Sequence, residues 1–414
     1  MLRKTRLSLG LVLIALILLS AFILDYLAIW PFANVNSGRP VYLNGAQNGS
    51  DASLAADPLF SAGEFSLVEA NNIAYKTEVV VEGLEVPWSV VFTSPDRILV
   101  TERTGRIREI VGGELRDEPL YEFTEITARG EAGLMGMVLD PNYSINRHLY
   151  VCYATTPAGT MIARVARFTD TGNGLSDSMI VVDNIPAANN HAGCELAFGP
   201  DGKLYVTTGD ASNREIAQDL GNLGGKILRV NADGTVPADN PFANSRVWSY
   251  GHRNPQGIAW YPGSEVLYAA EHGPSGFDGP GGGDEINLIK PGENYGWPRV
   301  SHQNSAQGMV DPLVVFTPAI APASILFYDS EQIPEFQNNL FAGMLVGEGM
   351  TRFVINPENL EEILMYEKLP LDDFGRIREL VMGPDGQMYF ATSNRDGRGN
   401  VRGGDDKIVR IIPQ

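Results

Sequence analysis

The stretch NNHAGCELAFGPDGKLYVTTGD, residues 189–210, decides the fold of this 414-residue chain. Two apolar runs flank the turn Pro200–Gly202, and an Asp-Gly turn between apolar runs predicts a β-hairpin. A hairpin brings its far ends together, so we expect His191 and Asp210 to lie close to each other. A carboxylate beside an imidazole is the arrangement of a general base and its orienting partner. The alternative is a solvated loop histidine and a turn-forming aspartate.

The same strand–turn–strand pattern recurs along the body of the chain at spacings of roughly 45 to 70 residues. Further β-rich runs lie between the copies, and no long segment shows a helical period. Six units of about four antiparallel strands predict an all-β, six-bladed β-propeller. The six copies are SVVFTSPDRILVTE from Ser89, GMVLDPNYSINRHLYVCYA from Gly136, ELAFGPDGKLYVTTGD from Glu195, GIAWYPGSEVLYAAEHGP from Gly257, SILFYDSEQIPEFQNNLFAGML from Ser324 and ELVMGPDGQMYFATS from Glu379.

We predict that the propeller covers residues 74–414. Its two ends, Tyr75–Glu82 and Lys407–Ile412, are both β-rich, and we expect them to pair within the last blade and close the ring. Two separate β-sandwich domains are the alternative architecture, and the repeats count against it.

The N-terminal segment is of a different kind. Three basic residues precede an almost unbroken apolar run, Leu7–Trp30, which matches the roughly 20 residues that cross a bilayer. Residues 1–30 are therefore predicted to be a signal anchor or transmembrane segment, with a cleaved signal peptide as the alternative. Residues 31–73, rich in Asn, Ser, Gly and Ala, are predicted to be a flexible linker. This places the body outside the cytoplasm, in the periplasm or at the cell surface, with the membrane as a partner.

Charge and cysteine content narrow the possible partners. A net charge of −19 argues against nucleic acid, because phosphate binding requires clustered Lys and Arg. The chain has 2 cysteines, Cys152 and Cys194, in or beside predicted strands of consecutive repeats. They could pair outside the cell, but the sequence favours two buried free thiols.

Polar motifs fall near strand ends, which a propeller gathers at one central mouth. The motifs VPWSVVF, GPDGKLYVTTGD, AQDLGNLGGKILRVNADGTVPADNPF, GHRNPQG, GDEINLIKPGENYGWP and GRIRE follow one another along the chain. On these motifs the chain resembles the soluble quinoprotein glucose dehydrogenase and PQQ-dependent aldose sugar dehydrogenase (glucose/sorbosone dehydrogenase) family, from about Gly83 to Pro413. The resemblance implies a six-bladed propeller with PQQ over its central opening and calcium close by.

The resemblance also implies roles for individual residues. His191 matches the catalytic base and Asp210 its partner, while Arg253 and Asn254 match the pair facing the reactive carbonyl oxygen of the cofactor. The remaining matches are Arg376 and Arg378 for the quinone and its carboxylates, the carbonyls of Gly273 and Pro274 for the cofactor's calcium, and Glu285 and Tyr295 for a second calcium.

These residue types suit sugar oxidation independently of the resemblance. Oxidising a sugar hemiacetal needs a base with a pKa near neutral, and His supplies one. Arg stabilises negative charge on a quinone oxygen and engages carboxylates with its forked geometry. Calcium prefers carbonyl and carboxylate oxygens, which the Gly-rich acidic segment 271–298 offers. Taken singly, each residue also has a plainer interpretation: Arg376 and Arg378 on the solvated face of an edge strand, Arg253 tying a loop, and Glu285 in a solvated turn.

Three positions depart from the family pattern. Val346 stands where relatives usually carry a Lys that reaches the cofactor, and Glu131 where they carry a Gln beside it. Cys194-Glu195 replaces the more usual Gly-Arg. Losing a cation and gaining carboxylates should weaken the binding of an anionic quinone.

The sequence therefore predicts PQQ- and calcium-dependent oxidation of aldoses at the anomeric carbon to lactones. His191, Asp210 and Arg253 are the predicted catalytic residues, and Glu131, Asn254, Arg376 and Arg378 are the predicted cofactor contacts. Two alternatives remain: a non-catalytic propeller that binds a glycan or a protein, and a calcium-dependent lactonase-type hydrolase.

Overall fold

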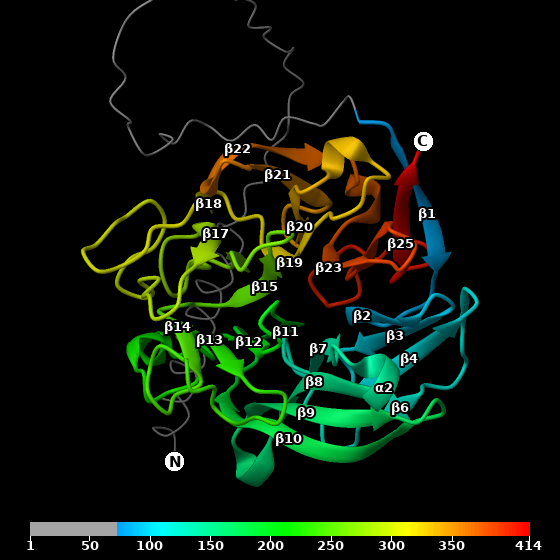
Figure 1. The fold of residues 1–414 in the computed structure, drawn as a ribbon, viewed down its shortest axis with the longest axis horizontal. Helices are drawn as coiled ribbons and strands as arrows, with labels where there is room; N and C mark the ends of the chain where they lie inside the picture. The colour runs from blue at the N-terminus through cyan, green and yellow to red at the C-terminus, as the bar shows by residue number, and fades with distance from the viewer. Residues whose placement is uncertain (1–72) are drawn as a thin grey trace, which may run out of the picture. The chain divides into compact units, whose positions relative to one another are not determined.

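A computed structural model describes residues 73–414, which form six antiparallel sheets around a common axis (Figure 1). The first strands of the sheets contact one another in a closed ring, so the predicted six-bladed propeller is confirmed and separate sandwiches are excluded. In order around the ring these strands are β2 (Pro87–Ser94), β7 (Leu134–Leu139), β11 (Gly193–Phe198), β15 (Pro255–Trp260), β19 (Pro322–Phe327) and β23 (Ile377–Met382).

The other strands extend each blade outward from its first strand. Blade 1 adds β3 (Arg97–Glu102), β4 (Arg106–Val111), β5 (Glu114–Leu115) and β6 (Tyr121–Glu122). Blade 2 adds β8 (His148–Thr155), β9 (Ile162–Asp170) and β10 (Leu175–Pro186). Blade 3 adds β12 (Leu204–Thr208), β13 (Lys226–Val230) and β14 (Val247–Tyr250). Blade 4 adds β16 (Leu267–Glu271), β17 (Asp284–Ile289) and β18 (Val314–Phe316). Blade 5 adds β20 (Leu340–Met344), β21 (Met350–Asn356) and β22 (Asn359–Leu369). Blade 6 adds β24 (Met388–Thr392), β25 (Ile408–Pro413) and β1 (Tyr75–Val81).

Helices are few and short in the described part of the chain. They are α2 (Tyr143–Asn146) and the 3₁₀ turns η1 (Pro157–Gly159), η2 (Arg214–Gln218), η3 (Pro334–Phe336) and η4 (Asp372–Phe374).

Each of the six sequence repeats forms the first two strands of one blade. In the third copy β11 pairs antiparallel with β12, with Leu196 opposite Val206. Gly202 closes the turn between them with φ of 71°, a conformation that glycine adopts without the Cβ penalty of other residues. The predicted hairpin is therefore confirmed.

The last blade combines both ends of the propeller. β1 pairs antiparallel with β25, with Lys76 opposite Ile412, as the β-rich ends predicted (Figure 1). Because β1 comes from the start of the described chain and β23 to β25 from its end, this pairing closes the ring.

The core lies between blades. The cluster between blades 2 and 3 includes Tyr150, Leu204 and Leu228, all fully buried. All five residues of β20 are buried, which explains why such strands are apolar without strict alternation.

The two cysteines form a disulfide, so the preference for free thiols was wrong. Cys152 in β8 of blade 2 faces Cys194 in β11 of blade 3 across this core, with Cα atoms 5.8 Å apart. That separation lies within the range that disulfides span. Sequence placed both residues in consecutive repeats, but only the blade packing shows that they meet.

The predicted anchor, residues 1–30, lies outside the described residues, as does the linker up to residue 72. Within residues 73–414 no helix has the length and hydrophobicity needed to span a bilayer.

Candidate active site

The hairpin of blade 3 brings His191 and Asp210 together, as predicted. His191 Nδ1 lies 2.6 Å from Asp210 Oδ1, and the two residues are 3% and 1% exposed. The alternative of a solvated histidine is therefore wrong. The contact needs glycine at position 209, because an added Cβ there would lie 1.9 Å from the carbonyl oxygen of His191.

Hydrogen-bond donors surround the Asp210 carboxylate. Oδ1 accepts from the main-chain N–H of Ser212 (2.8 Å), and Oδ2 accepts from the indole N–H of Trp297 (2.8 Å). These donors favour an ionised carboxylate, to which His191 donates from Nδ1. Nε2 then keeps its lone pair, which is what a general base requires.

An exposed aromatic ring lies over the base. Phe277, 67% exposed, stacks on the His191 imidazole with ring centroids 6.0 Å apart. The next residue, Asp278, pairs with Arg253 (Nε–Oδ2, 2.7 Å), which fixes this loop beside the dyad.

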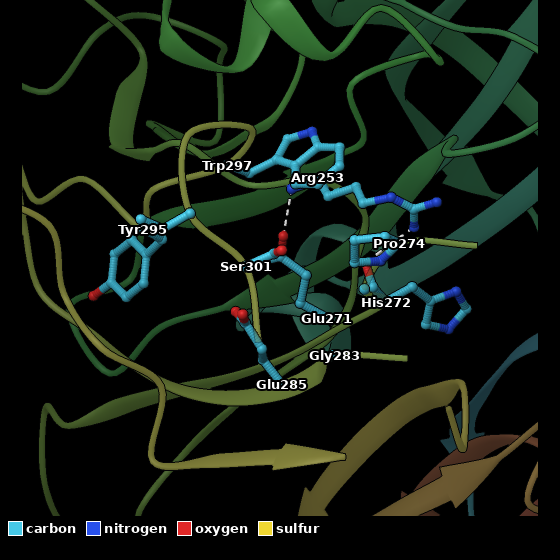
Figure 2. Close-up of a pocket in the computed structure, with 11 residues that line it drawn as sticks. Arg253, Glu271, His272, Pro274, Gly283, Glu285, Tyr295, Trp297 and Ser301 are labelled. Carbon is cyan, nitrogen blue, oxygen red and sulfur yellow. Dashed lines mark hydrogen bonds between the residues drawn. The ribbon is translucent and has the colours of Figure 1, made fainter. Parts of the chain in front are cut away.

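Arg253 is buried and bound on all sides. Its guanidinium also donates to the carbonyl of His272 (3.1 Å) and to Ser275 Oγ (3.0 Å), and it lies 5.6 Å from the Trp297 ring centre. Figure 2 shows the side chain running between Trp297 and Pro274. Trp297 therefore contacts both Asp210 and Arg253.

Glu131 connects the base to a cation from another blade. Its carboxylate accepts from the main-chain N–H of His191 (2.8 Å) and pairs with Arg398 (2.8 Å). Burial alone would raise the pKa of Glu131, but the charges of His272, Arg398 and His191 outweigh it and lower the pKa to about 2. The acidic substitution seen in the sequence is thus balanced by Arg398. Asn254 donates to the same carboxylate at 3.4 Å and braces Gly193 N–H through its Oδ1.

Two arginines at the start of blade 6 differ in their partners. Arg376 pairs with Asp396 (2.6 Å) and donates to the carbonyl of Leu345 (2.6 Å). Arg378 lies 3.9 Å from the Trp88 ring centre, and its two hydrogen bonds, to Ser393 Oγ and Gln256 Oε1, are long at 3.5 and 3.4 Å. Both arginines are buried, so the solvated-face interpretation is wrong.

Arg378 is the less satisfied of the two cations. Among the described residues no carboxylate lies within ion-pair distance of its guanidinium, and burial lowers its pKa to about 10. A buried guanidinium without a counter-ion is a favourable position for an anionic ligand. Val346, where relatives usually carry a lysine, is 61% exposed.

A small cavity beside Arg253 is otherwise lined by residues of blade 4. This cavity, about 10 Å³ for a water-sized sphere, has room for about one water or ion. The carboxylates of Glu271 and Glu285 both line it; Glu271 accepts from the main-chain N–H of Arg253 (Figure 2), and burial together with the charge of Glu271 raises the pKa of Glu285. The cavity lining also includes Gly273, Pro274, Tyr295, Trp297 and Ser301.

The donors at this cavity are oxygens. Asn287 donates to Glu285 Oε2 (3.0 Å), while its own Oδ1 is buried without a hydrogen-bond partner among the described residues. The phenolic oxygen of Tyr295 is engaged by Lys290 N–H (2.8 Å) and the Leu288 carbonyl (2.7 Å). No group of three or more His, Cys, Asp or Glu side chains suited to a metal occurs within residues 73–414, so a cation here would depend on main-chain carbonyls as well.

The structure thus gathers the predicted residues into two neighbouring sets joined by Trp297. His191, Asp210, Glu131, Asn254 and Arg253 form one set, and Gly273, Pro274, Glu285 and Tyr295 the other. The predicted residues Arg376 and Arg378 bond to neither set and lie with partners of their own. Sequence reasoning missed Trp297, Phe277, Asp278 and Arg398. Trp297 lies in the NYGWP motif and could have been marked; Arg398 lies in a loop that no motif marked.

Comparison with known proteins finds sugar dehydrogenases among the relatives of this chain. A Thermus thermophilus protein, named as an oxidoreductase of the glucose dehydrogenase type, superposes with a TM-score of 0.76 and 41% identity, over 82% of this chain and 100% of that one. The PQQ-bound aldose sugar dehydrogenase of Streptomyces coelicolor gives 0.73 and 31%, over 83% and 100%. The aldose sugar dehydrogenase of Escherichia coli is 33% identical over 347 residues, 77% of this chain and 90% of that one.

The family described as Glucose / Sorbosone dehydrogenase matches residues 84–405, nearly the whole propeller. The chain therefore belongs to the glucose/sorbosone dehydrogenase family.

Proposed function

We propose that this protein oxidises the anomeric carbon of aldoses to lactones, with PQQ as cofactor and calcium as the accompanying ion. The observation that carries the proposal is the buried His191–Asp210 pair, and Arg378, a buried guanidinium with no carboxylate in ion-pair contact among the described residues, supports it. Membership of a sugar dehydrogenase family and the PQQ-bound relative support it.

His191 performs the proton transfer in this proposal. Nε2 takes the proton of the C1 hydroxyl as hydride leaves C1, so that the C1–O bond becomes the carbonyl of the lactone. The imidazolium that forms is stabilised by Asp210, which stays ionised because Trp297 and Ser212 donate to it. A positioned base of this kind contributes about 10²- to 10⁴-fold to the rate.

The charged side chains near the His191–Asp210 pair suit a tricarboxylate quinone. Arg378 offers its guanidinium to a carboxylate, and Trp88 holds that guanidinium by its ring face. Arg398 neutralises Glu131, so the acidic residue adds little repulsion. When bound, PQQ supplies the two-electron acceptor. Arg376, already paired with Asp396, is the weaker candidate contact.

The cavity beside Arg253 fits a hard cation. Glu285 with Glu271, the unpartnered Asn287 Oδ1 and the carbonyls of the lining residues are oxygen donors of the kind calcium prefers. A dication would relieve the repulsion between the two carboxylates. Because the hydroxyl of Tyr295 is already engaged, Tyr295 would contribute its main-chain carbonyl. The carbonyls of Gly273 and Pro274 are the proposed contacts for a calcium at the cofactor.

We also propose that the body works outside the cytoplasm. The disulfide between Cys152 and Cys194 is of a kind that persists in oxidising compartments. The apolar run near the N-terminus supports export, with the anchor as the proposed attachment to the membrane.

Reconstitution separates this proposal from its rivals. Protein supplied with PQQ and CaCl₂ should bind the cofactor, and adding an aldose should bleach the quinone spectrum. His191→Ala should keep cofactor binding and lose turnover by at least a hundredfold, whereas His148→Ala, distant on β8, should behave as wild type. Cofactor uptake without bleaching would favour a binding propeller, and lactone hydrolysis by calcium-loaded, PQQ-free protein would favour a hydrolase.

A further inference from the structure

The six first strands share an irregularity at the same place. In each, the pairing with the second strand shifts register near the second or third residue, as at Gly193/Leu196 in β11 and Ile377/Glu379 in β23. Such bulges redirect the side chains beside them. The residue at this point is the first residue of each sequence repeat: Ser89, Gly136, Glu195, Gly257, Ser324 and Glu379.

Four of these six positions carry small residues. An added Cβ would lie 2.3 Å from the Cys194 carbonyl oxygen at Gly136 and 2.5 Å from the Ala323 carbonyl oxygen at Gly257, because the next first strand passes close by. The other two are Glu195 and Glu379. Their strands, β11 and β23, are three blades apart in a ring of six and lie on opposite sides of the axis (Figure 1). The charge of Glu379 acts on Glu195, so the two carboxyl groups are within electrostatic reach of each other.

The hydrogen bonds around Glu379 call for a proton. Ser89 Oγ lies 3.1 Å from the Met137 carbonyl oxygen and 3.1 Å from Glu379 Oε1, yet a hydroxyl has one hydrogen to donate. If Glu379 were ionised and Ser89 donated to Met137, Oε1 would keep only the long contact from the main-chain N–H of Val90 (3.4 Å). If Glu379 is protonated, it donates to Ser89 Oγ, which donates to Met137, and both contacts are satisfied.

The second oxygen of Glu379 gives an independent indication. Oε2 is buried and makes no hydrogen bond of good geometry within residues 73–414: the neighbouring hydroxyl of Ser324 donates to the Leu380 carbonyl oxygen at 3.5 Å, and Glu379 as a whole is 5% exposed. An ionised oxygen in that position would lose its hydration without compensation.

The charge balance around the pair leads to the same result. Arg378 is the cation that acts on both carboxylates. The first strands of the other four blades place no ionisable side chain at this level. Burial raises the pKa of Glu379 to about 8, and burial with the charge of Glu379 raises the pKa of Glu195. Two carboxylates and one guanidinium leave one negative charge, which one proton balances.

We propose that Glu195 and Glu379 form a proton-binding site on the propeller axis, a carboxyl–carboxylate pair that holds one proton at neutral pH. Release of this proton at alkaline pH leaves an unbalanced negative charge beside Arg378. The site shares Arg378 with the proposed cofactor contact, but its test reads the stability of the protein alone and requires neither cofactor nor turnover.

The test is the pH dependence of unfolding. A glutamic acid in the unfolded chain titrates near pH 4.3, whereas Glu379 in the folded protein titrates at about 8. Between these values the folded protein holds one extra proton, so the stability it contributes is full below pH 4.3 and is lost as the pH rises through 8. The unfolding constant of wild type, divided by that of Glu379→Gln, should rise about tenfold per pH unit between pH 5.5 and 7.5.

Matched variants keep the test specific. Glu195→Gln should move the upper end of the slope to lower pH without removing it, because a like charge is lost while burial still raises the pKa of Glu379. Glu195→Arg should remove the slope by placing a permanent cation opposite Glu379, and Glu358→Gln in an exposed turn should leave it intact. The infrared band of a protonated carboxyl group should be present in wild type at pH 7 and absent from Glu379→Gln. A flat ratio, or no such band, would overturn the proposal. So would a ratio that depends on added Na⁺ or Ca²⁺ rather than on pH, since a metal ion would then be the occupant.

Discussion

His191 and Glu195 are four residues apart in the sequence, yet their surroundings at the mouth and on the axis differ in kind. Around the His191–Asp210 pair the two carboxylates have partners: Asp210 has His191 and Trp297, and Glu131 has Arg398. On the axis the charges of Glu379 and Arg378 both act on Glu195, and neither carboxylate has an ion pair among the described residues. The complete network fixes orientation, whereas the incomplete one leaves a group free to titrate near neutral pH.

The largest effect should come from breaking the mouth at its centre. Asp210→Asn keeps the shape of the side chain but can present an N–H to His191 Nδ1, which would hold the imidazole in the wrong tautomer. We expect turnover to fall by about 10³- to 10⁴-fold, by analogy with the loss of the orienting aspartate in serine protease triads. PQQ binding followed by absorbance should be unchanged. Turnover within tenfold of wild type would contradict the role of the dyad.

The next effect tests the disulfide that joins blades 2 and 3 between these two regions of the sequence. Cys194 stands between His191 and Glu195 and is tied to Cys152, 42 residues away. Replacing both cysteines by alanine should lower the free energy of unfolding by about 3–4 kcal/mol, because the unfolded chain gains the freedom of that loop. Denaturant unfolding measures this, and reduced wild type is the matched control. A double variant as stable as the oxidised protein would contradict the expectation.

A smaller effect should follow from Trp297→Phe, which removes the indole donor to Asp210 Oδ2 and keeps an aromatic ring beside Arg253. We expect kcat to fall by about ten- to a hundredfold, because a buried carboxylate oxygen loses one charge-assisted hydrogen bond. KM for the aldose should change little. Trp248→Phe, in β14 of the same blade as the dyad, is the control. A rise in KM without a fall in kcat would contradict a positioning role.

The smallest effect separates the two regions by the sign of their pH response. The pKa of Glu131 is lowered to about 2, so its stabilisation is present above pH 4.3 and lost as the pH falls toward 2. Glu131→Gln should cost about 1–2 kcal/mol at pH 7, since the partner Arg398 is half exposed. Unfolding from pH 7 to pH 2.5 should show this cost shrinking on acidification, the reverse of Glu379→Gln. A cost independent of pH would contradict the ion pair.

Much of what the sequence predicted correctly depended on local sequence patterns. The Asp-Gly turn between apolar runs predicted the hairpin, and with it the meeting of His191 and Asp210. The β-rich ends predicted the pairing of β1 with β25. These succeeded because each depends on residues in one hairpin or on the requirement that a ring must close.

What the sequence did not predict depends on contacts between blades. Trp297 reaches Asp210 from blade 4, and Arg398 reaches Glu131 from blade 6, with no local pattern to link them. The disulfide was missed for the same reason. The axial pair had a signal that was not used: the six repeats begin with Ser, Gly, Glu, Gly, Ser and Glu, so two acidic residues stand out at a position otherwise filled by small ones.

The pairing of β1 with β25 also sets the order in which the molecule can be completed. The sixth sheet takes its outermost strand from near residue 75 and its other three from the last residues of the chain. A chain that is being synthesised or exported therefore keeps an open seam until its final strand, Ile408–Pro413, is available. Truncating those six residues should leave five sheets with two exposed edges, which would be prone to associate with other copies through their unpaired main-chain groups.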